Sequence, residues 1–280
     1  MNNSFKKIYF HVGLAKTGST FLQKNFFPYL KNIKYINTHD YINCIEIINK
    51  TNYRSYLISR EFDQQFEREI KIFMSYFPET KIIIVFRRHD KWLASQYKRS
   101  VKNGYHWNFK KYYSINNKGM WKDSDLTYIN KIKIIKKYSK SDPLILKFDE
   151  LNKNPFNYLN RISNYTKSQY SKGKISLNTV HESYSEKQLI FLQKFCKIFK
   201  KTPPKYYDYQ EISLDKSISN KNRIKHWLYY RPWWLLFHLV MYTSLLIPRF
   251  LIHKNSLINK NDLNEIKNKF KEDWKKVFEY

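Results

Sequence analysis

The chain has little cysteine, glycine or alanine. Its two cysteines, Cys44 and Cys196, are too few and too far apart for a disulfide framework or a zinc site, so we expect a protein of a reducing compartment. Residues 1–10 contain no apolar stretch long enough for a signal peptide, which favours a cytoplasmic location. Glycine occurs five times in 280 residues, and two of the five lie in one short segment, 13–20.

Acidic residues are scarce as well. The chain has 23 Asp and Glu against 52 Lys and Arg, a formal net charge of +29. Such a charge is typical of nucleic-acid-binding proteins. Here the lysines are scattered, and they accompany abundant Asn, Ile and Tyr, a composition that a low-G+C coding bias produces. We therefore expect no nucleic-acid partner, although the positive field would attract an anionic nucleotide or an anionic membrane surface.

Short apolar runs alternate with helical patterns along the first two thirds of the chain. This alternation predicts an α/β fold, in which a parallel β-sheet of four to five strands is flanked by helices. We expect residues 1–200 to form this core and residues 201–280 a helical extension. The expected strands are 7–12, 56–59, 81–86 and 144–148, and the expected helices are 20–27, 62–77, 89–101 and 188–199.

The glycine-containing segment 13–20, GLAKTGST, lies between the first expected strand and the first expected helix. Such a loop presents backbone N–H groups and the positive end of a helix dipole to an anion. Lys16 adds a charge, and Thr17, Ser19 and Thr20 add hydroxyl donors. A P-loop of nucleotide triphosphatases needs Gly-Lys-Ser/Thr in that order. Lys16 precedes Gly18, so the segment predicts a phosphate site without the magnesium arrangement of an ATPase.

Residues 11–23, HVGLAKTGSTFLQ, resemble the 5′-phosphosulfate loop of sulfotransferases that use 3′-phosphoadenosine 5′-phosphosulfate (PAPS). The resemblance implies a P-loop-like sulfotransferase fold. It also implies that Lys16 contacts the bridging oxygen and the 5′-phosphate. The neighbouring residues that would hold the phosphate are Gly13, Thr17, Gly18, Ser19 and Thr20.

A second segment carries the same resemblance. Sulfotransferases have an arginine at the end of a buried strand and a serine eight positions later, and both contact the 3′-phosphate of the cofactor. Arg87, after the 81–86 run, and Ser95 have that spacing. Residues 144–159 resemble a later strand and helix of the family, with a structural role. The resemblance covers residues 6–200, but the glycine-rich loop that covers the cofactor in many members is absent, and 177–186 occupies its approximate position.

Sulfonate transfer requires removal of the acceptor proton and neutralisation of the leaving phosphate oxygen, and by this logic no metal. Lys16 would stabilise the leaving group. Glu61 is the first candidate for the base, because it follows the 56–59 strand at the carboxyl edge of the sheet, where ligands bind in such folds. The alternatives are His106, His39 and His181.

The resemblance is to bacterial members that act on sugars, so the expected acceptor is a carbohydrate such as capsule, lipopolysaccharide or another surface glycan. Aromatic residues that could stack on sugar rings are Tyr105, Trp107, Tyr112, Tyr113 and Trp121. In a chain with 18% aromatic residues, a place in the hydrophobic core is the more economical interpretation.

Residues 226–252 are strongly apolar and aromatic, and His238 is the one ionisable residue within 232–247. This stretch is shorter than the roughly 20 residues that a membrane-spanning helix needs. Trp and Tyr at its start and basic residues at both ends favour a segment that lies on the inner face of the cytoplasmic membrane, where a lipid-linked glycan would be reached. A buried helical hairpin is the alternative.

Two other functions are compatible with parts of the sequence. A P-loop-type nucleotide kinase or phosphotransferase would use the 13–20 segment but not the Arg87 and Ser95 pair. A non-catalytic, basic, membrane-associated binding protein would account for the charge and for residues 226–252, and would leave both phosphate motifs without a role.

Overall fold

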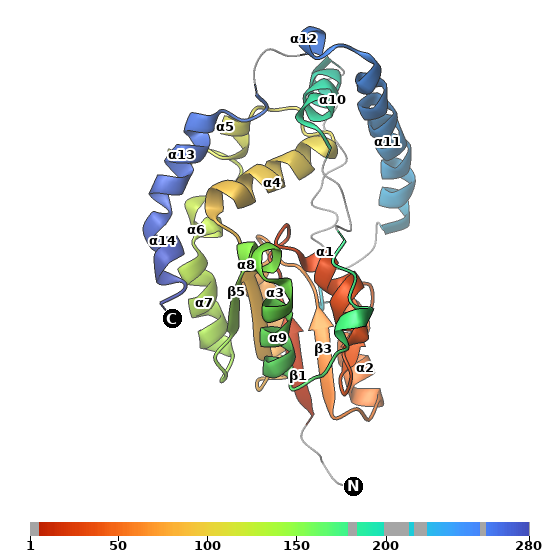
Figure 1. The fold of residues 1–280 in the computed structure, drawn as a ribbon, viewed down its shortest axis with the longest axis vertical. Helices are drawn as coiled ribbons and strands as arrows, with labels where there is room; N and C mark the ends of the chain where they lie inside the picture. The colour runs from red at the N-terminus through yellow and green to blue at the C-terminus, as the bar shows by residue number, and fades with distance from the viewer. Residues whose placement is uncertain (1–5, 179–183, 199–212, 216–222, 253–255, 280) are drawn as a thin grey trace.

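The computed structural model describes residues 6–178, 184–198, 213–215, 223–252 and 256–279 (Figure 1). Five parallel strands form one sheet in the order β2-β3-β1-β4-β5. The strands are β1 (Lys7–His11), β2 (Lys34–Ile36), β3 (Ser55–Ser59), β4 (Lys81–Phe86) and β5 (Leu144–Lys147). The predicted α/β class with a parallel sheet flanked by helices is confirmed.

The strand β4 shows why the sheet must be covered on both sides. In its sequence, KIIIVF, the lysine is followed by five apolar residues, four of them β-branched, and successive side chains point to opposite faces. Ile82 and Ile84 join one hydrophobic cluster, whereas Ile83 and Val85 join the other. The strand missed by the sequence analysis, β2, has three half-buried or buried residues at the sheet edge, too few for a periodic pattern.

Helices cover both faces of the sheet, and the helix that follows β1 lies on the opposite face from the helices that follow β3 and β4. One face carries α1 (Ser19–Phe21), which continues through η1 (Leu22–Phe26) and η2 (Phe27–Tyr29), together with α8 (Phe148–Lys153) and α9 (Pro155–Thr166). The other face carries η3 (Tyr41–Asn43), α2 (Cys44–Lys50), α3 (Phe66–Tyr76), α4 (His89–Lys102) and α7 (Tyr128–Tyr138). Because the connection after β1 goes to one face and those after β3 and β4 go to the other, a crevice opens at the carboxyl edge of β1.

The start of α3 differs from the sequence prediction, which placed it at residue 62. The helix begins at Phe66 because the backbone N–H of Phe62 donates to the carbonyl of Val12 at 3.2 Å, which keeps the chain at the sheet edge for three more residues. The Phe62 side chain is fully buried beside Phe10. The turn this creates, residues 60–65, lies directly over the β1 crevice.

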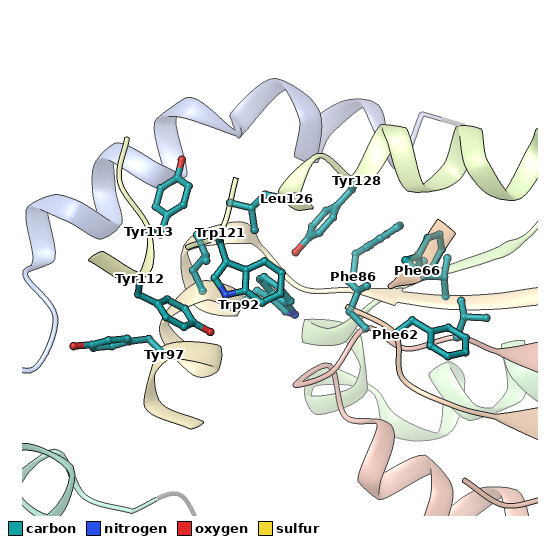
Figure 2. Close-up of a cluster of buried hydrophobic side chains, with 14 of the residues drawn as sticks. Phe62, Phe66, Phe86, Trp92, Tyr97, Tyr112, Tyr113, Trp121, Leu126 and Tyr128 are labelled. Carbon is teal, nitrogen blue, oxygen red and sulfur yellow. The ribbon is translucent and has the colours of Figure 1, made fainter. Parts of the chain in front are cut away.

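Buried aromatic side chains fill the space between α4, α5 (Phe109–Tyr112), α6 (Asp123–Leu126) and α7 (Figure 2). The rings of Trp92 and Trp121 meet edge to face at 5.1 Å between centroids. Tyr112, Tyr113 and Trp121 are at most 4% exposed, so the suggestion that these three stack on sugar rings is wrong. They are core residues, as the alternative interpretation held.

Two further helices from the end of the chain join this aromatic core. Helices α13 (Lys260–Lys269) and α14 (Lys271–Lys276) lie along α4 and α7 (Figure 1). The carboxylate of Asp273 accepts hydrogen bonds from the first backbone N–H groups of α7, those of Tyr128 at 2.9 Å and Ile129 at 3.2 Å. It also lies 3.0 Å from Nε2 of the buried His89. The C-terminal helices therefore help to hold α4 and α7 against the sheet; the domain boundary near residue 200 stays a prediction.

Helices α10 (Glu186–Ile198), α11 (Arg223–Thr243) and α12 (Arg249–Ile252), with η6 (Ser244–Leu246), stand above the carboxyl edge of the sheet (Figure 1). Helix α10 packs against both α4 and α11. In the described part of the chain, no helix combines the length and the apolarity that crossing a membrane requires.

Asp273→Ala should lower the free energy of unfolding by about 1–3 kcal/mol, because it leaves buried N–H donors without an acceptor. Burial alone would raise the pKa of Asp273, but the contacts with His89 and the two amides outweigh it and leave the pKa below its usual value. In the wild type, the stabilisation that Asp273 contributes should therefore be complete above about pH 4 and should disappear as the pH falls through the lowered pKa. Urea titration would measure it, with the exposed neighbour in Glu272→Ala as control; equal losses in both variants would contradict this role.

Candidate active site

The loop between β1 and α1 depends on two glycines. Gly13 has φ +90°, and a Cβ there would lie 3.0 Å from the Cα of Glu61. Gly18 has φ +85°, and its Cβ would lie 3.0 Å from Leu151 and 3.1 Å from the Phe148 ring. Both positions thus favour glycine by conformation and by space. The second contact also explains the segment after β5: its apolar side chains support the loop from below.

Carbonyl oxygens of the loop accept the side-chain hydrogen bonds that hold its conformation. The hydroxyls of Thr17 and Ser19 both donate to the carbonyl oxygen of Leu14, at 2.5 and 3.2 Å. The indole of Trp92, from α4, donates to the carbonyl of Ala15 at 2.8 Å. By contrast, none of the hydrogen bonds among the described residues uses the backbone N–H groups of residues 16–20. These amides, at the start of a helix, are the donors available to an anion.

Arg87, at the end of β4, reaches the same loop. Its Nη1 donates to the carbonyl oxygen of Lys16 at 3.2 Å, and its guanidinium lies 4.8 Å from the centroid of the Phe148 ring. Burial, partly opposed by the nearby Asp149, lowers the pKa of this guanidinium, and its Nε is buried without a hydrogen-bond partner among the described residues. The two segments that the sequence analysis paired thus meet in space. The next residue, Arg88, instead pairs with Asp90 at 2.7 and 2.8 Å.

Ser95 lies half-buried on α4. It shares a helix face with Trp92, three positions before it, and Arg99, four positions after it. Both of those side chains contact the crevice, Trp92 through Ala15 and Arg99 through Asp63. This places Ser95 on the side of α4 that faces the loop.

Lys16 extends from the loop into a group of cations. Its backbone is left-handed, with φ 64°, and the residue as a whole is exposed while its ammonium group is partly desolvated. Desolvation, followed by the positive charges of Arg99, Lys102 and Arg87, lowers its pKa to about 8, while Glu61 opposes the shift. A lysine whose pKa is lowered by desolvation and by other cations would gain from a bound anion, which supplies an opposite charge.

A cavity of about 570 Å³ opens beside the loop. Glu61 lines it, and desolvation together with Asp63 raises the pKa of this carboxyl, against the influence of Arg99, Ser19 and Arg60. A carboxyl with a raised pKa in a cleft is a candidate general base. The cavity is lined by Ala15, Thr20, Gln23, Thr38, Arg60, Glu61, Asp63, Gln65, Arg99, Asn103, Tyr230, Arg231 and Trp234.

Asp63 is the residue that the sequence analysis missed and that connects the site. Its Oδ1 accepts from the backbone N–H of Ala15 at 3.3 Å. Its Oδ2 accepts from Gln96 and from Arg99 of α4, each at 3.2 Å. The signal that selected Glu61, a place just after β3 at the carboxyl edge, applies equally to Asp63. Arg99 and the α11 side chains had no such signal, because only the packing of distant helices brings them to the cavity.

The candidate histidines do not meet the loop. His106 follows α4, beside Trp107, and is not among the residues that line the cavity. Desolvation and the charges of Lys111 and Lys197 lower its pKa. His39 is exposed in the turn after β2, and His181 lies outside the described residues. Of the three residues predicted to act in catalysis, Lys16 thus belongs to the loop and Glu61 lies beside it, whereas His106 lies apart from both.

No family model matches the chain, and no curated protein is similar to it in sequence. Among solved structures, a sulfotransferase from Alicyclobacillus acidocaldarius is 13% identical, with a TM-score of 0.47, over 70% of this chain and 92% of its own. Mouse sulfotransferase SULT7A1, complexed with PAP, is 11% identical, with a TM-score of 0.44, over 98% and 85%. Retinol dehydratase in complex with androsterone and inactive cofactor PAP is 10% identical, with a TM-score of 0.34, over 85% and 79%. Similarities this low do not by themselves assign a function.

Asp63→Ala should destabilise the protein by about 2–4 kcal/mol, because it removes the ion pair with Arg99 and the acceptor of the Ala15 amide in a largely buried place. Chemical denaturation of the purified variant would measure this. Glu67→Ala, an exposed acidic residue on α3, is the matched control and should change stability by less than about 0.5 kcal/mol. Equal stability of the two variants would show that Asp63 does not hold the loop.

Proposed function

We propose that the chain is a sulfotransferase that moves a sulfonate from PAPS to a hydroxyl group of a carbohydrate acceptor, such as capsule, lipopolysaccharide or another surface glycan. The observation that carries this proposal is the contact between Arg87 and the carbonyl of Lys16. It joins an anion-binding loop to a second cation at the end of a neighbouring strand, so two phosphate groups of one nucleotide can be held together.

The residues present fit a nucleotide with phosphates at two positions. The amides of residues 16–20 and the Lys16 ammonium would hold the 5′-phosphate. Arg87, whose Nε has no partner among the described residues, would hold the 3′-phosphate with Ser95. PAPS, when bound, supplies an activated sulfonate. The hydroxyls of Thr17 and Ser19 are used within the loop, so backbone amides rather than these side chains would carry most of the phosphate contacts.

The cavity supplies the acceptor side of the reaction. Glu61 would accept the proton of the acceptor hydroxyl as the new S–O bond forms, and Lys16 would neutralise the phosphate oxygen that leaves. Lys16 belongs to the loop and Glu61 lies beside it, and the effect of the Glu61 carboxylate, which raises the pKa of Lys16, reflects their proximity. Glu61 is preferred over His106 as the base because it lines the cavity and His106 does not.

Lys16→Ala and Arg87→Ala should each weaken binding of 3′-phosphoadenosine 5′-phosphate (PAP) by about tenfold or more, because each removes a charge-assisted phosphate contact. Isothermal titration calorimetry would measure the affinities. Lys24→Ala and Arg54→Ala remove exposed cations elsewhere on the protein and should leave the affinity unchanged.

Magnesium with ATP is the comparison ligand in this titration. Weak ATP binding alongside tight PAP binding would support the sulfotransferase. A preference for ATP with magnesium would instead favour a phosphotransferase, and no binding of either nucleotide would favour the non-catalytic alternative.

Glu61→Gln should lower the rate of sulfonate transfer by about 10²–10⁴-fold, because the amide cannot accept the proton, and should leave PAP affinity unchanged. Since the pKa of Glu61 is raised, wild-type activity should fall at low pH sooner than an ordinary glutamate, near pH 4.3, would require. Activity should also fall as the pH rises through about 8, where Lys16 loses its proton. Measuring the release of PAP from PAPS with a panel of simple glycosides as a function of pH would give both the acidic and the alkaline limb of this activity profile.

Two variants separate the limbs of this profile. Lys16→Arg should keep its charge and extend activity to higher pH, whereas His106→Gln should change neither limb. An acid limb that survives in Glu61→Gln but vanishes in His106→Gln would assign the base to the histidine instead.

A further inference from the structure

Helix α11 has two apolar sides that point in opposite directions. On its inner side, Phe237, Val240 and Met241 are at most 7% exposed and belong to the main hydrophobic cluster, next to α10. On the other side lies an exposed row that we call the α11 outer face: Leu228 (59% exposed), Leu235 (60%), Leu239 (60%), Tyr242 (57%) and Leu246 (87%) in the following turn. The spacing of seven, four, three and four residues keeps this row on one side of the helix.

The outer face continues beyond the helix. In α12, Phe250 is 73% and Leu251 64% exposed. A soluble protein normally surrounds a helix that is apolar on every side, and contiguous exposed apolar surface marks a place of interaction. Within the described residues nothing covers this face, so its occupant must come from outside those residues.

The third side of α11 belongs to the candidate active site. Tyr230, Arg231 and Trp234 line the cavity that contains Glu61. The hydroxyl of Tyr230 lies 3.3 Å from Oδ1 of Asn103 on the turn after α4, and the guanidinium of Arg231 lies 5.1 Å from the Trp234 ring centroid. One helix therefore forms a wall of the cavity and also presents the outer face, so whatever docks on that face lies next to the cavity.

The positive charge of this part of the chain favours an anionic partner for the outer face. Between Asp215 and Asp262 the sequence contains no acidic residue, and the basic residues there whose side chains the structure describes are Arg231 on α11 and Lys260 at the start of α13. Two lysines of α10 reach the same region, because Lys187 donates to the carbonyl of Leu245 at 3.2 Å and Lys194 to that of Ile252. An apolar row bordered by cations matches the boundary between acyl chains and anionic headgroups. A second copy of this chain, itself +29, would meet the face with repulsion.

We propose that the α11 outer face docks on the surface of a membrane that contains anionic lipids, with α11 lying along the interface rather than crossing it. The cavity then lies at the level of the headgroups. If the proposed sulfotransferase function holds, on which this last step rests, the acceptor is a lipid-linked glycan presented at that surface.

Vesicle sedimentation of the full chain tests the docking without any acceptor. Wild-type protein should sediment with vesicles of phosphatidylcholine and phosphatidylserine, much less with phosphatidylcholine alone, and less as salt is raised. The triple variant Leu235→Gln, Leu239→Gln, Leu246→Gln should bind the anionic vesicles about tenfold or more weakly, because three apolar contacts are lost. The matched control, Ile115→Gln, Tyr76→Gln, Leu177→Gln, alters exposed apolar residues elsewhere and should bind as wild type.

Three results would overturn the proposal. These are no sedimentation with anionic vesicles, equal sedimentation of the two triple variants, and a wild-type dimer in analytical ultracentrifugation that only the α11 variant dissociates. The last would make the face a contact between copies of the chain. PAP titration of the same samples keeps the two proposals apart, since vesicle binding without PAP binding would retain the docking surface and reject the sulfotransferase.

Discussion

The carboxylate of Asp63 is the interaction on which the arrangement of the site depends. It accepts from the amide of Ala15 in the loop after β1 and from Gln96 and Arg99 on α4. These segments are separated by more than thirty residues of sequence in each case and approach one another only at the carboxyl edge of the sheet. A carboxylate in this position compensates one of several crowded cations and fixes the loop against the helix. The conformation of residues 13–20 is therefore determined from both sides, by Asp63 above and by Phe148 and Leu151 below.

The same crowding gives the site its chemistry. Lys16, Arg87, Arg99 and Lys102 lie near one another with few acidic partners, and desolvation and mutual repulsion lower the pKa of Lys16 to about 8. Such a site is costly without a ligand and gains from a polyanion. Glu61, at the rim of this group, has a raised pKa because burial outweighs its cationic neighbours. A proton acceptor and an anion-binding group thus border one cavity, which supports group transfer from an anionic donor.

Helix α11 adds a second constraint. Pro232 and the aromatic residues around it gave a sequence pattern that did not distinguish an interfacial segment from a buried one. The inner side of the helix is buried against α10, whereas its outer side is exposed, and an interfacial role for that outer side is our proposal. Because α11 both lines the cavity and carries the exposed apolar face, docking of that face on a membrane would bring the cavity close to an acceptor at the membrane surface, as we propose.

The sequence by itself determined the α/β class, four of the five strands and the two segments that meet at the loop. Those features are local: β-branched runs such as 82–85 form buried strands. Lys16 lies in the loop that follows β1 and Arg87 directly follows β4, and a parallel sheet brings the ends of these strands to one edge. The short strand β2 and the late start of α3 were not predicted, and the core position of Tyr112 was left open, because all three depend on contacts with residues distant in the sequence. Only the tertiary structure decided which charged side chains join the site. Asp63, Arg99 and Arg231 come from three separate elements, and their convergence follows from how α4 and α11 pack over the sheet, which no local pattern encodes.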